Sequence, residues 1–300
     1  MNKYTTKQLK YDLLLLIIIV VWGVNFPILK HVLEVMHPFV VNIFRFTASI
    51  LAILFIYAFQ KNSFLNWRVI KSRFFSFLLL GLLGYFLYQL FFILGINNTT
   101  AGNSAIIMAS SPVWTAVVAI TFYKEKLTRA AWIGLVLSVA GAIYVSLSGE
   151  NRISLNRELI IGNTLILAAS ICWGAYTAFS KPATQFIDAK GITLIGLIIS
   201  FPFNLFLAIP HMDDIMWGEL NWLFWLAIVY SGALSTGLAV VAWTYSVQKV
   251  GATHTAVFGN LVPFVALVAS YFILQEHIQP DQLLGGSLIV GGLILMRLNR

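Results

Sequence analysis

Charge and cysteine are both scarce in this sequence of 300 residues. Only 10% of the residues are charged and 59% are hydrophobic, whereas soluble domains average about a quarter charged. A chain of this composition cannot cover a water-soluble fold with polar surface. The single cysteine, Cys172, excludes an intramolecular disulfide and gives no information on the redox compartment.

Signatures of enzyme chemistry are also missing. The sequence has no Gly-x-Ser-x-Gly motif, phosphate-binding glycine loop, paired histidine metal motif or cluster of carboxylates. Acidic residues avoid the middle of the apolar stretches, and Glu125 and Glu276 fall at helix ends. This distribution argues against a dedicated carboxylate relay for protons within a membrane. We therefore expect no enzyme activity, no metal and no cofactor.

Long apolar stretches dominate the sequence instead. Ten of them have about the twenty residues needed to cross a hydrocarbon core of roughly 30 Å. They run from Leu13 to Leu29, Phe39 to Phe59, Phe74 to Ile96, Ala101 to Tyr123, Ala130 to Leu147, Leu159 to Ser180, Ile192 to Ile209, Trp222 to Val247, Thr253 to Leu274 and Leu283 to Leu298. Such runs fit helices and not alternating barrel strands. The prediction is an all-α integral membrane protein with ten transmembrane helices.

Basic residues predict the orientation. Fifteen of the 19 lysines and arginines fall on the side that both chain ends share, three fall on the opposite side, and Arg45 lies within a span. Because cytoplasmic loops carry the excess of basic residues, we expect a multi-pass protein of the cell inner membrane with both termini in the cytoplasm. The same asymmetry explains the net charge of +8, so a nucleic-acid partner is not expected.

An internal repeat organises the chain. Trp22 and Gly23 recur as Trp173 and Gly174, an offset of 173 − 22 = 151 residues. The same offset pairs Lys30 with Lys181, Gly81 with Gly232, Ala101 with Ala252, Ala105 with Ala256, Pro112 with Pro263, Glu125 with Glu276, Gly134 with Gly285 and Gly141 with Gly292. We therefore predict two five-helix repeats, residues 1–149 and 150–300. Because five is odd, the second repeat is inverted relative to the first, as in many transporters; a duplicated bundle kept for stability or dimerisation is the alternative.

The recurring motifs resemble those of the EamA family of the drug/metabolite transporter superfamily. Each half has an early Trp-Gly pair, a helix with a mid-span proline, and a glutamate that closes this helix ahead of a glycine-bearing one. These are Trp22-Gly23, Pro112, Glu125, Gly134 and Gly141, then Trp173-Gly174, Pro263, Glu276, Gly285 and Gly292. The resemblance covers nearly the whole chain. It implies export of small metabolites, such as amino acids or related amphipathic compounds, from a central cavity lined by the first, third and fourth helices of each half.

Polar and aromatic side chains at helical spacing within the spans are the candidate substrate-binding residues. They are Trp22, Asn25, Tyr85, Tyr88, Gln89, Met108, Ser111, Trp114, Trp173, Tyr176, Thr177, Trp243 and Asn260. In the functional interpretation, aromatic rings bind the apolar part of a substrate, and amides and hydroxyls bind its polar part. Helix packing, interfacial anchoring and satisfaction of carbonyls freed by the prolines are the alternatives. Asn25 is matched by Tyr176 in the repeat, which argues against a symmetric site.

Arg45, matched by Gly196 in the repeat, lies well inside a span. It could pair with Glu34, extend to the surface, or hold a substrate carboxylate. Because the predicted cavity faces carry no net charge, we expect a neutral or zwitterionic substrate, with a hydrophobic cation as the next candidate.

The predicted function is a secondary transporter, an exporter of small metabolites that works by alternating access. Four alternatives stay open: a hydrophobic cation or drug exporter, a lipid-active membrane enzyme, a non-transporting partner protein, and a passive channel. The expected partners are a small-molecule substrate and the lipid bilayer. A monomer is compatible with the sequence, which does not give the oligomeric state.

Overall fold

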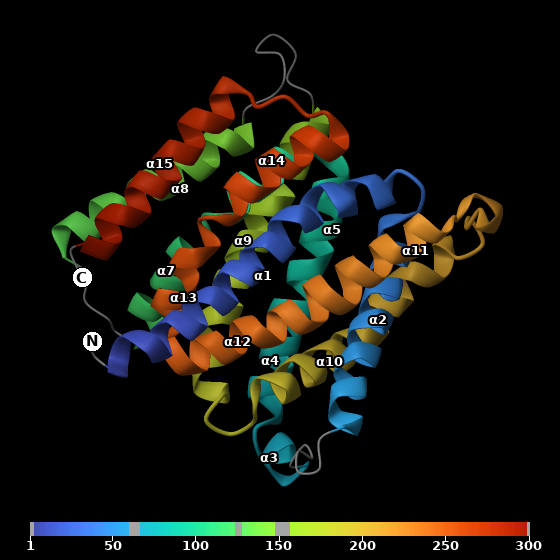
Figure 1. The fold of residues 1–300 in the computed structure, drawn as a ribbon, viewed down its shortest axis with the longest axis horizontal. Helices are drawn as coiled ribbons and strands as arrows, with labels where there is room; N and C mark the ends of the chain where they lie inside the picture. Colours follow the sequence, from blue (N-terminus) through green and yellow to red (C-terminus); the bar gives the residue numbers. More distant parts are fainter. Residues whose placement is uncertain (1–2, 60–66, 124–127, 148–156, 299–300) are drawn as a thin grey trace.

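The computed structural model describes residues 3–59, 67–123, 128–147 and 157–298, and its regular secondary structure within these ranges is helical. The helices of the first half are α1 (Lys3–Leu33), α2 (Pro38–Ala58), α3 (Trp67–Ser72), α4 (Phe74–Gly81), the π-helix η1 (Leu82–Leu87), α5 (Tyr88–Asn98), α6 (Ala101–Met108), α7 (Ser111–Tyr123) and α8 (Arg129–Leu147) (Figure 1). α4, η1 and α5 follow one another without a gap. α6 and α7 are separated by a break at residues 109–110.

The second half repeats this order of elements. Its helices are α9 (Arg157–Ala183), α10 (Ala189–Ala208), the 3-10 helices η2 (Ile209–His211) and η3 (Trp217–Glu219), α11 (Trp222–Val229), the π-helix η4 (Tyr230–Leu238), α12 (Ala239–Val250), α13 (Ala252–Gly259), α14 (Val262–Leu274) and α15 (Pro280–Leu298). The predicted offset returns in the helix bounds, because α13, α14 and α15 begin 151 residues after α6, α7 and α8 (252 − 101, 262 − 111 and 280 − 129). Pro112 and Pro263 stand at the second position of α7 and α14, where a proline is tolerated but cannot continue a preceding helix.

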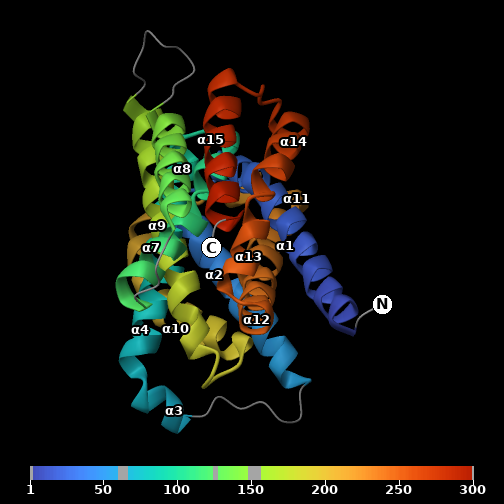
Figure 2. The same ribbon diagram turned by 90° about the vertical axis from the view of Figure 1, so that its left-hand side faces the viewer.

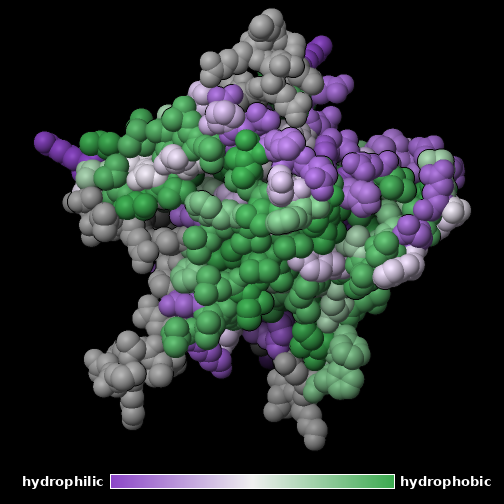
Figure 3. All heavy atoms as spheres, turned by 45° about the horizontal axis from the view of Figure 1, so that its top comes forward, coloured by the Kyte–Doolittle hydropathy of each residue, from purple (hydrophilic) through white to green (hydrophobic). Residues whose placement is uncertain are grey.

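Seven helical stretches of the described chain are long and apolar enough to cross a membrane. They are Leu9–Leu33, Pro38–Ala58, Phe74–Asn98, Ala101–Phe122, Arg157–Ala183, Ala189–His211 and Trp222–Val250. The other three predicted spans are helical too, as α8, α13 with α14, and α15, but they are not among these seven. Figure 3 shows a broad hydrophobic area on one face of the molecule, with hydrophilic residues gathered along one margin, as expected for a surface that contacts lipid.

Close helix contacts show how the two halves are arranged. A Cβ atom placed on Gly23 would lie 2.5 Å from Val265 Cβ, and one placed on Gly174 would lie 2.6 Å from Trp114 Cβ. These contacts are reciprocal, because Gly174 and Val265 lie 151 residues after Gly23 and Trp114. Reciprocal contacts of this kind are those of a twofold relation.

The twofold axis passes between residues that contact their own counterparts. Ser138 Oγ donates a 2.9 Å hydrogen bond to the carbonyl of Ile289, which lies 151 residues later. This bond joins α8 and α15, which pack side by side at one edge of the molecule (Figures 1 and 2). The rings of Trp22 and Trp173, which are also counterparts, meet edge to face with their centroids 5.5 Å apart. The axis therefore runs from the α8–α15 pair to this tryptophan pair.

Candidate functional site

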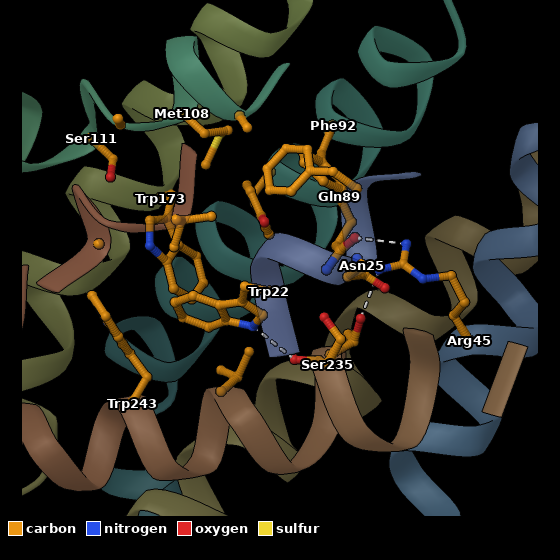
Figure 4. Close-up of a pocket in the computed structure, with 18 residues that line it drawn as sticks. Trp22, Asn25, Arg45, Gln89, Phe92, Met108, Ser111, Trp173, Ser235 and Trp243 are labelled. Atoms are coloured by element: carbon orange, nitrogen blue, oxygen red, sulfur yellow. Dashed lines mark hydrogen bonds between the residues drawn. The ribbon is translucent and has the colours of Figure 1, made fainter. Parts of the chain in front are cut away.

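A pocket lies at the twofold axis, between the two halves (Figure 4). Its walls come from α1, α2, α5, α6 and α7 of the first half and α9, η4, α12, α13 and α14 of the second. Trp22, Tyr88 and Met108 pack against both hydrophobic clusters of the molecule, so the pocket lies where the two cores meet. Its volume is about 60 Å³, space for only a few water molecules.

Aromatic rings form one side of the pocket. The Trp22 ring centroid lies 5.5 Å from that of Trp173 and 4.9 Å from that of Trp243, and the Tyr88 centroid lies 5.0 Å from that of Trp173. Trp22 Nε1 donates a 3.1 Å hydrogen bond to the Ser235 carbonyl, which fixes the orientation of the indole. Rings at these separations attract one another and present a continuous apolar surface. This side is suited to the apolar part of a ligand.

Arg45 forms the opposite, polar side of the pocket. It is 1% exposed, and its guanidinium donates to Thr236 Oγ1 at 2.7 Å, to Asn42 Oδ1 at 3.0 Å and to Gln89 Oε1 at 3.2 Å. All three acceptors are neutral. No aspartate or glutamate lines the pocket, and within the described chain no acidic side chain forms an ion pair with Arg45.

Two of the three alternatives for Arg45 and the expectation of an uncharged cavity are wrong. Arg45 does not pair with Glu34, which instead contacts His31 Nδ1 at 3.1 Å on the exposed surface. Arg45 does not extend to the surface either, because the helices of both halves enclose it. The cavity is not neutral, because the Arg45 guanidinium lines it.

Three of the eight buried polar side-chain atoms that lack a hydrogen-bond partner in the described chain belong to residues of the pocket lining. Within the described chain, Asn25 Oδ1, Arg45 Nε and Trp243 Nε1 are buried and make no hydrogen bond. Figure 4 shows Asn25 and Gln89 beside the Arg45 guanidinium, with Trp22, Trp173 and Trp243 at the other end. Buried polar atoms nearly always have partners, so this group has unused capacity to bind a ligand.

The structure brings together nine of the residues singled out from the sequence. The pocket lining includes Trp22, Asn25, Arg45, Tyr88, Gln89, Met108, Ser111, Trp173 and Trp243. The lining does not include Tyr85, Trp114, Tyr176, Thr177 and Asn260. Trp114 is turned to Ser110, whose Oγ accepts from its Nε1 at 3.3 Å. Ser110, and not Ser111, donates to a carbonyl before the proline, that of Ile107 at 2.7 Å.

Tyr85 and Tyr176 fill the region that the twofold relates to the polar side. Tyr176 is the counterpart of Asn25, and Gly196 is the counterpart of Arg45. A Cβ atom on Gly196 would lie 2.3 Å from the Tyr85 ring, so that ring occupies the space an arginine would need. The two tyrosine hydroxyls lie 3.0 Å apart and share a hydrogen bond. The polar side of the pocket therefore exists only once.

Several lining residues were not among the candidates. They are Phe26, Phe92, Ala105, Ala109, Ser235, Thr236, Val240, Gly259 and Val262. The offset carried a signal for seven of them, because each is the counterpart of a candidate residue: Phe26, Phe92, Ala109, Thr236, Val240, Gly259 and Val262. Ser235 and Thr236 lie in η4; π-helical turns are frequent at functional sites, but this one has no signal in the sequence.

The break in the fourth helix of each half borders the pocket. A proline ring displaces the carbonyl four residues earlier, which belongs to Met108 for Pro112 and to Gly259 for Pro263. Both Met108 and Gly259 line the pocket. Backbone groups at such breaks commonly bind substrates or ions in transporters.

Among the described residues, no group of three or more His, Cys, Asp or Glu side chains is placed to hold a metal.

One family profile matches both halves of the chain, and a solved structure shares the fold of the whole chain. The sequence profile of the EamA-like transporter family matches residues 9–147 and again residues 160–298. An uncharacterized transporter of Bacillus subtilis (strain 168), YyaM, is 24% identical, over 96% of this chain and 93% of its own length. A probable terminal-alkyne amino-acid exporter of Streptantibioticus cattleyicolor is 25% identical, over 73% and 71% of the two chains. A solved crystal structure superposes with a TM-score of 0.69 at 15% identity, covering 97% of both chains.

Proposed function

We propose, from the premise that this chain belongs to the EamA-like transporter family, that it is a secondary transporter which exports small metabolites, namely amino acids or related amphipathic compounds. Membership of this family indicates a multi-pass membrane transporter rather than an enzyme. The observation that carries the proposal is the pocket on the twofold axis, whose walls come from both halves. A site in this place can open to either side of a membrane when the two halves exchange conformations.

The proposed topology has ten spans in two inverted repeats. Its support is the matching order of helices in the two halves, together with the reciprocal contacts between them. Fifteen of the 19 lysines and arginines would lie on the same side as both termini. We assign this side to the cytoplasm, with the protein in the cell inner membrane. Single cysteines introduced into the loops test this orientation with a thiol reagent that cannot cross membranes. The native Cys172 is buried and should not react.

The narrow pocket fits a step of alternating access. A volume of about 60 Å³ is small against the pockets of about 300–1,000 Å³ that enclose drug-sized ligands. Binding of a metabolite would therefore require the halves to move apart on one side. The helix breaks next to Met108 and Gly259, together with η1 and η4, are places where such a movement could bend the helices.

Uptake into proteoliposomes tests the proposal. The vesicles would receive a mixed labelled pool of amino acids and other small metabolites, with and without a pH gradient, and mass spectrometry would identify what accumulates. We expect saturable enrichment of one class, with a loss of saturation in Trp173→Ala and Gln89→Ala. Trp132→Ala and Gln185→Ala are matched controls, because both wild-type side chains are exposed and lie outside the pocket.

The other outcomes point to other functions. Flux that does not saturate would indicate a channel, and saturable uptake of hydrophobic amines alone would indicate a cation exporter. If no compound is enriched, or if both pocket variants behave as the wild type does, the proposed function is refuted.

A further inference from the structure

We infer that the pocket binds one carboxylate group, held by the Arg45 guanidinium, on a substrate whose apolar body lies against Trp22, Trp173 and Trp243. The inference rests on the proposed function and names the chemistry of its substrate. It corrects the expectation of a neutral cavity, because the charge that lines the pocket is a cation.

The first support is the unbalanced charge of Arg45. A buried cation is costly unless an anion pairs with it, and the described chain supplies Arg45 with neutral acceptors only: Asn42, Gln89 and Thr236. These bonds orient the guanidinium without neutralising it. A carboxylate that enters the pocket would regain favourable Coulomb energy in a place shielded from water, whereas an organic cation would be repelled.

The second support is the hydrogen-bonding capacity that remains. Arg45 Nε has no partner in the described part of the molecule, so the guanidinium can still donate to a carboxylate, the anion that its planar geometry fits best. Asn25 Oδ1 is a buried acceptor that also has no partner there, and Figure 4 shows it beside Arg45. A substrate with an N–H or O–H next to its carboxyl group would satisfy both residues. This is the chemistry of an apolar α-amino or α-hydroxy acid.

The third support is that this polar seat occurs once. A symmetric pair of repeats would offer a second seat across the axis, but Gly196 replaces arginine there and the Tyr85 ring fills the space. Tyr176 replaces asparagine and shares its hydroxyl hydrogen bond with Tyr85. The pocket therefore has one cationic end and one aromatic end, which favours a monocarboxylate over a dicarboxylate.

Calorimetry on the purified full-length chain tests the inference with matched compounds. The series is 3-phenylpropionate, its primary amide, 3-phenylpropylamine, phenylsuccinate and phenylalanine. We expect the monocarboxylate to bind about 10- to 100-fold more tightly than its amide, since hydrogen bonds to a charged group are worth that factor. The amine and the dicarboxylate should bind more weakly than the monocarboxylate. Phenylalanine should bind at least as tightly as 3-phenylpropionate, and Asn25→Ala should remove any advantage it has.

Variants of Arg45 separate recognition from folding. Arg45→Gln should bring the acid-to-amide ratio close to one while binding of the amide persists, and Arg45→Lys should keep part of the ratio. Arg129→Gln, at an exposed position outside the pocket, is the control and should leave the ratio unchanged. If Arg45→Gln fails to fold, the pH dependence of ligand binding by the wild type still tests the inference. Its affinity for the acid must fall as the pH drops below the pKa of the ligand's carboxyl group, while its affinity for the amide stays constant.

The outcomes distinguish this inference from the proposed function. Equal binding of acid and amide, or tighter binding of the amine, refutes the binding of a carboxylate by Arg45 but does not affect the proposed transport function. An unchanged ratio in folded Arg45→Gln refutes this binding as well. If no compound of the series binds, while the proteoliposomes still take up a metabolite, the carboxylate seat alone fails; if they take up nothing, both proposals fail.

Discussion

Replacing Gly232 by alanine tests the contact that sets α2 against the second half at Arg45. A Cβ atom at this position would lie 2.5 Å from the Arg45 carbonyl oxygen and 2.8 Å from Arg45 Cα. Both are backbone atoms, so rotation of a side chain cannot relieve the overlap. To reach ordinary van der Waals separation, α2 and η4 would have to move apart by about 1 Å. Ser49 Oγ donates to the carbonyls of both Arg45 and Gly232, at 2.7 and 2.8 Å, so this movement also strains those bonds.

The expected cost follows from these contacts. Overpacking costs about 1–3 kcal/mol, and strain of a buried hydrogen bond adds up to about 1 kcal/mol. The better helix propensity of alanine offsets up to about 1 kcal/mol. Gly232→Ala should therefore destabilise the protein by about 1–3 kcal/mol. The counterpart Gly81→Ala should cost less, because its Cβ would meet only side-chain atoms closely, Ile199 Cγ2 at 2.9 Å and Ile199 Cβ at 3.0 Å, while the nearest backbone atom, the Gly196 carbonyl oxygen, lies 3.5 Å away.

Circular dichroism of the purified variants in detergent, recorded against temperature and against denaturant, measures this order of stabilities. Gly291→Ala is the control, because no atom lies within 4 Å of its added Cβ. It should be as stable as the wild type or slightly more stable. Gly232→Ala should also lower the discrimination between carboxylate and amide ligands, since the shift displaces Arg45. If Gly232→Ala is as stable as the wild type, α2 and η4 do not pack as closely as inferred and the reasoning fails.

Three further predictions concern single contacts. Tyr176→Phe removes the 3.0 Å hydrogen bond with the buried Tyr85 hydroxyl and the 3.2 Å hydrogen bond with Thr244 Oγ1, and should cost about 1–3 kcal/mol in unfolding experiments. Adding Tyr85→Phe should recover part of this loss, and a further loss would contradict the account. Glu276→Gln should destabilise the protein by about 1–2 kcal/mol, because the Glu276 carboxylate accepts from the first two backbone N–H groups of α6 at 3.0 and 3.1 Å, while an amide has one acceptor oxygen; equal melting temperatures would count against this cap. Burial, and then the stacked His211 ring 3.5 Å away, lower the pKa of His37 from 6.5. The unfolded chain then binds more protons than the folded one just below pH 6.5, so stability should fall as the pH drops through that window; His37→Phe should show a smaller fall, and an equal fall in both would assign the effect to other groups.

Much of the fold was predictable because a bilayer restricts the possible structures. Each of the ten predicted spans corresponds to a helix or to a consecutive run of helices in the structure, since apolar runs of that length can satisfy their backbone in lipid only as helices. The offset of 151 residues predicted the two repeats, and the family match to residues 9–147 and 160–298 confirms the resemblance. The number of spans that cross the membrane stays a prediction.

The candidate site was predictable where the repeat pointed to it. Trp22 and Trp173 stand out in the sequence because they are the same residue at one offset, and a residue that contacts its own counterpart must lie on the axis. Residues on the first, third and fourth helices of each half gather around this pair, and Arg45 adds the second helix of the first half, which the resemblance did not imply. What these residues bind remains a proposal.

Only the tertiary structure decided which polar groups share the pocket. The spans are apolar on most faces, so hydrophobic periodicity does not tell which face of a helix meets lipid, a neighbouring helix or a cavity. Tyr85 and Gln89 lie one helical turn apart on one stretch, yet Tyr85 fills the space beside Gly196 and Gln89 accepts from Arg45. The sequence by itself determined the helices, their duplication and the residue types available. Arg45 lines one side of the pocket without an anionic partner because the two halves fill the space around their axis differently. Packing of this kind is set in three dimensions.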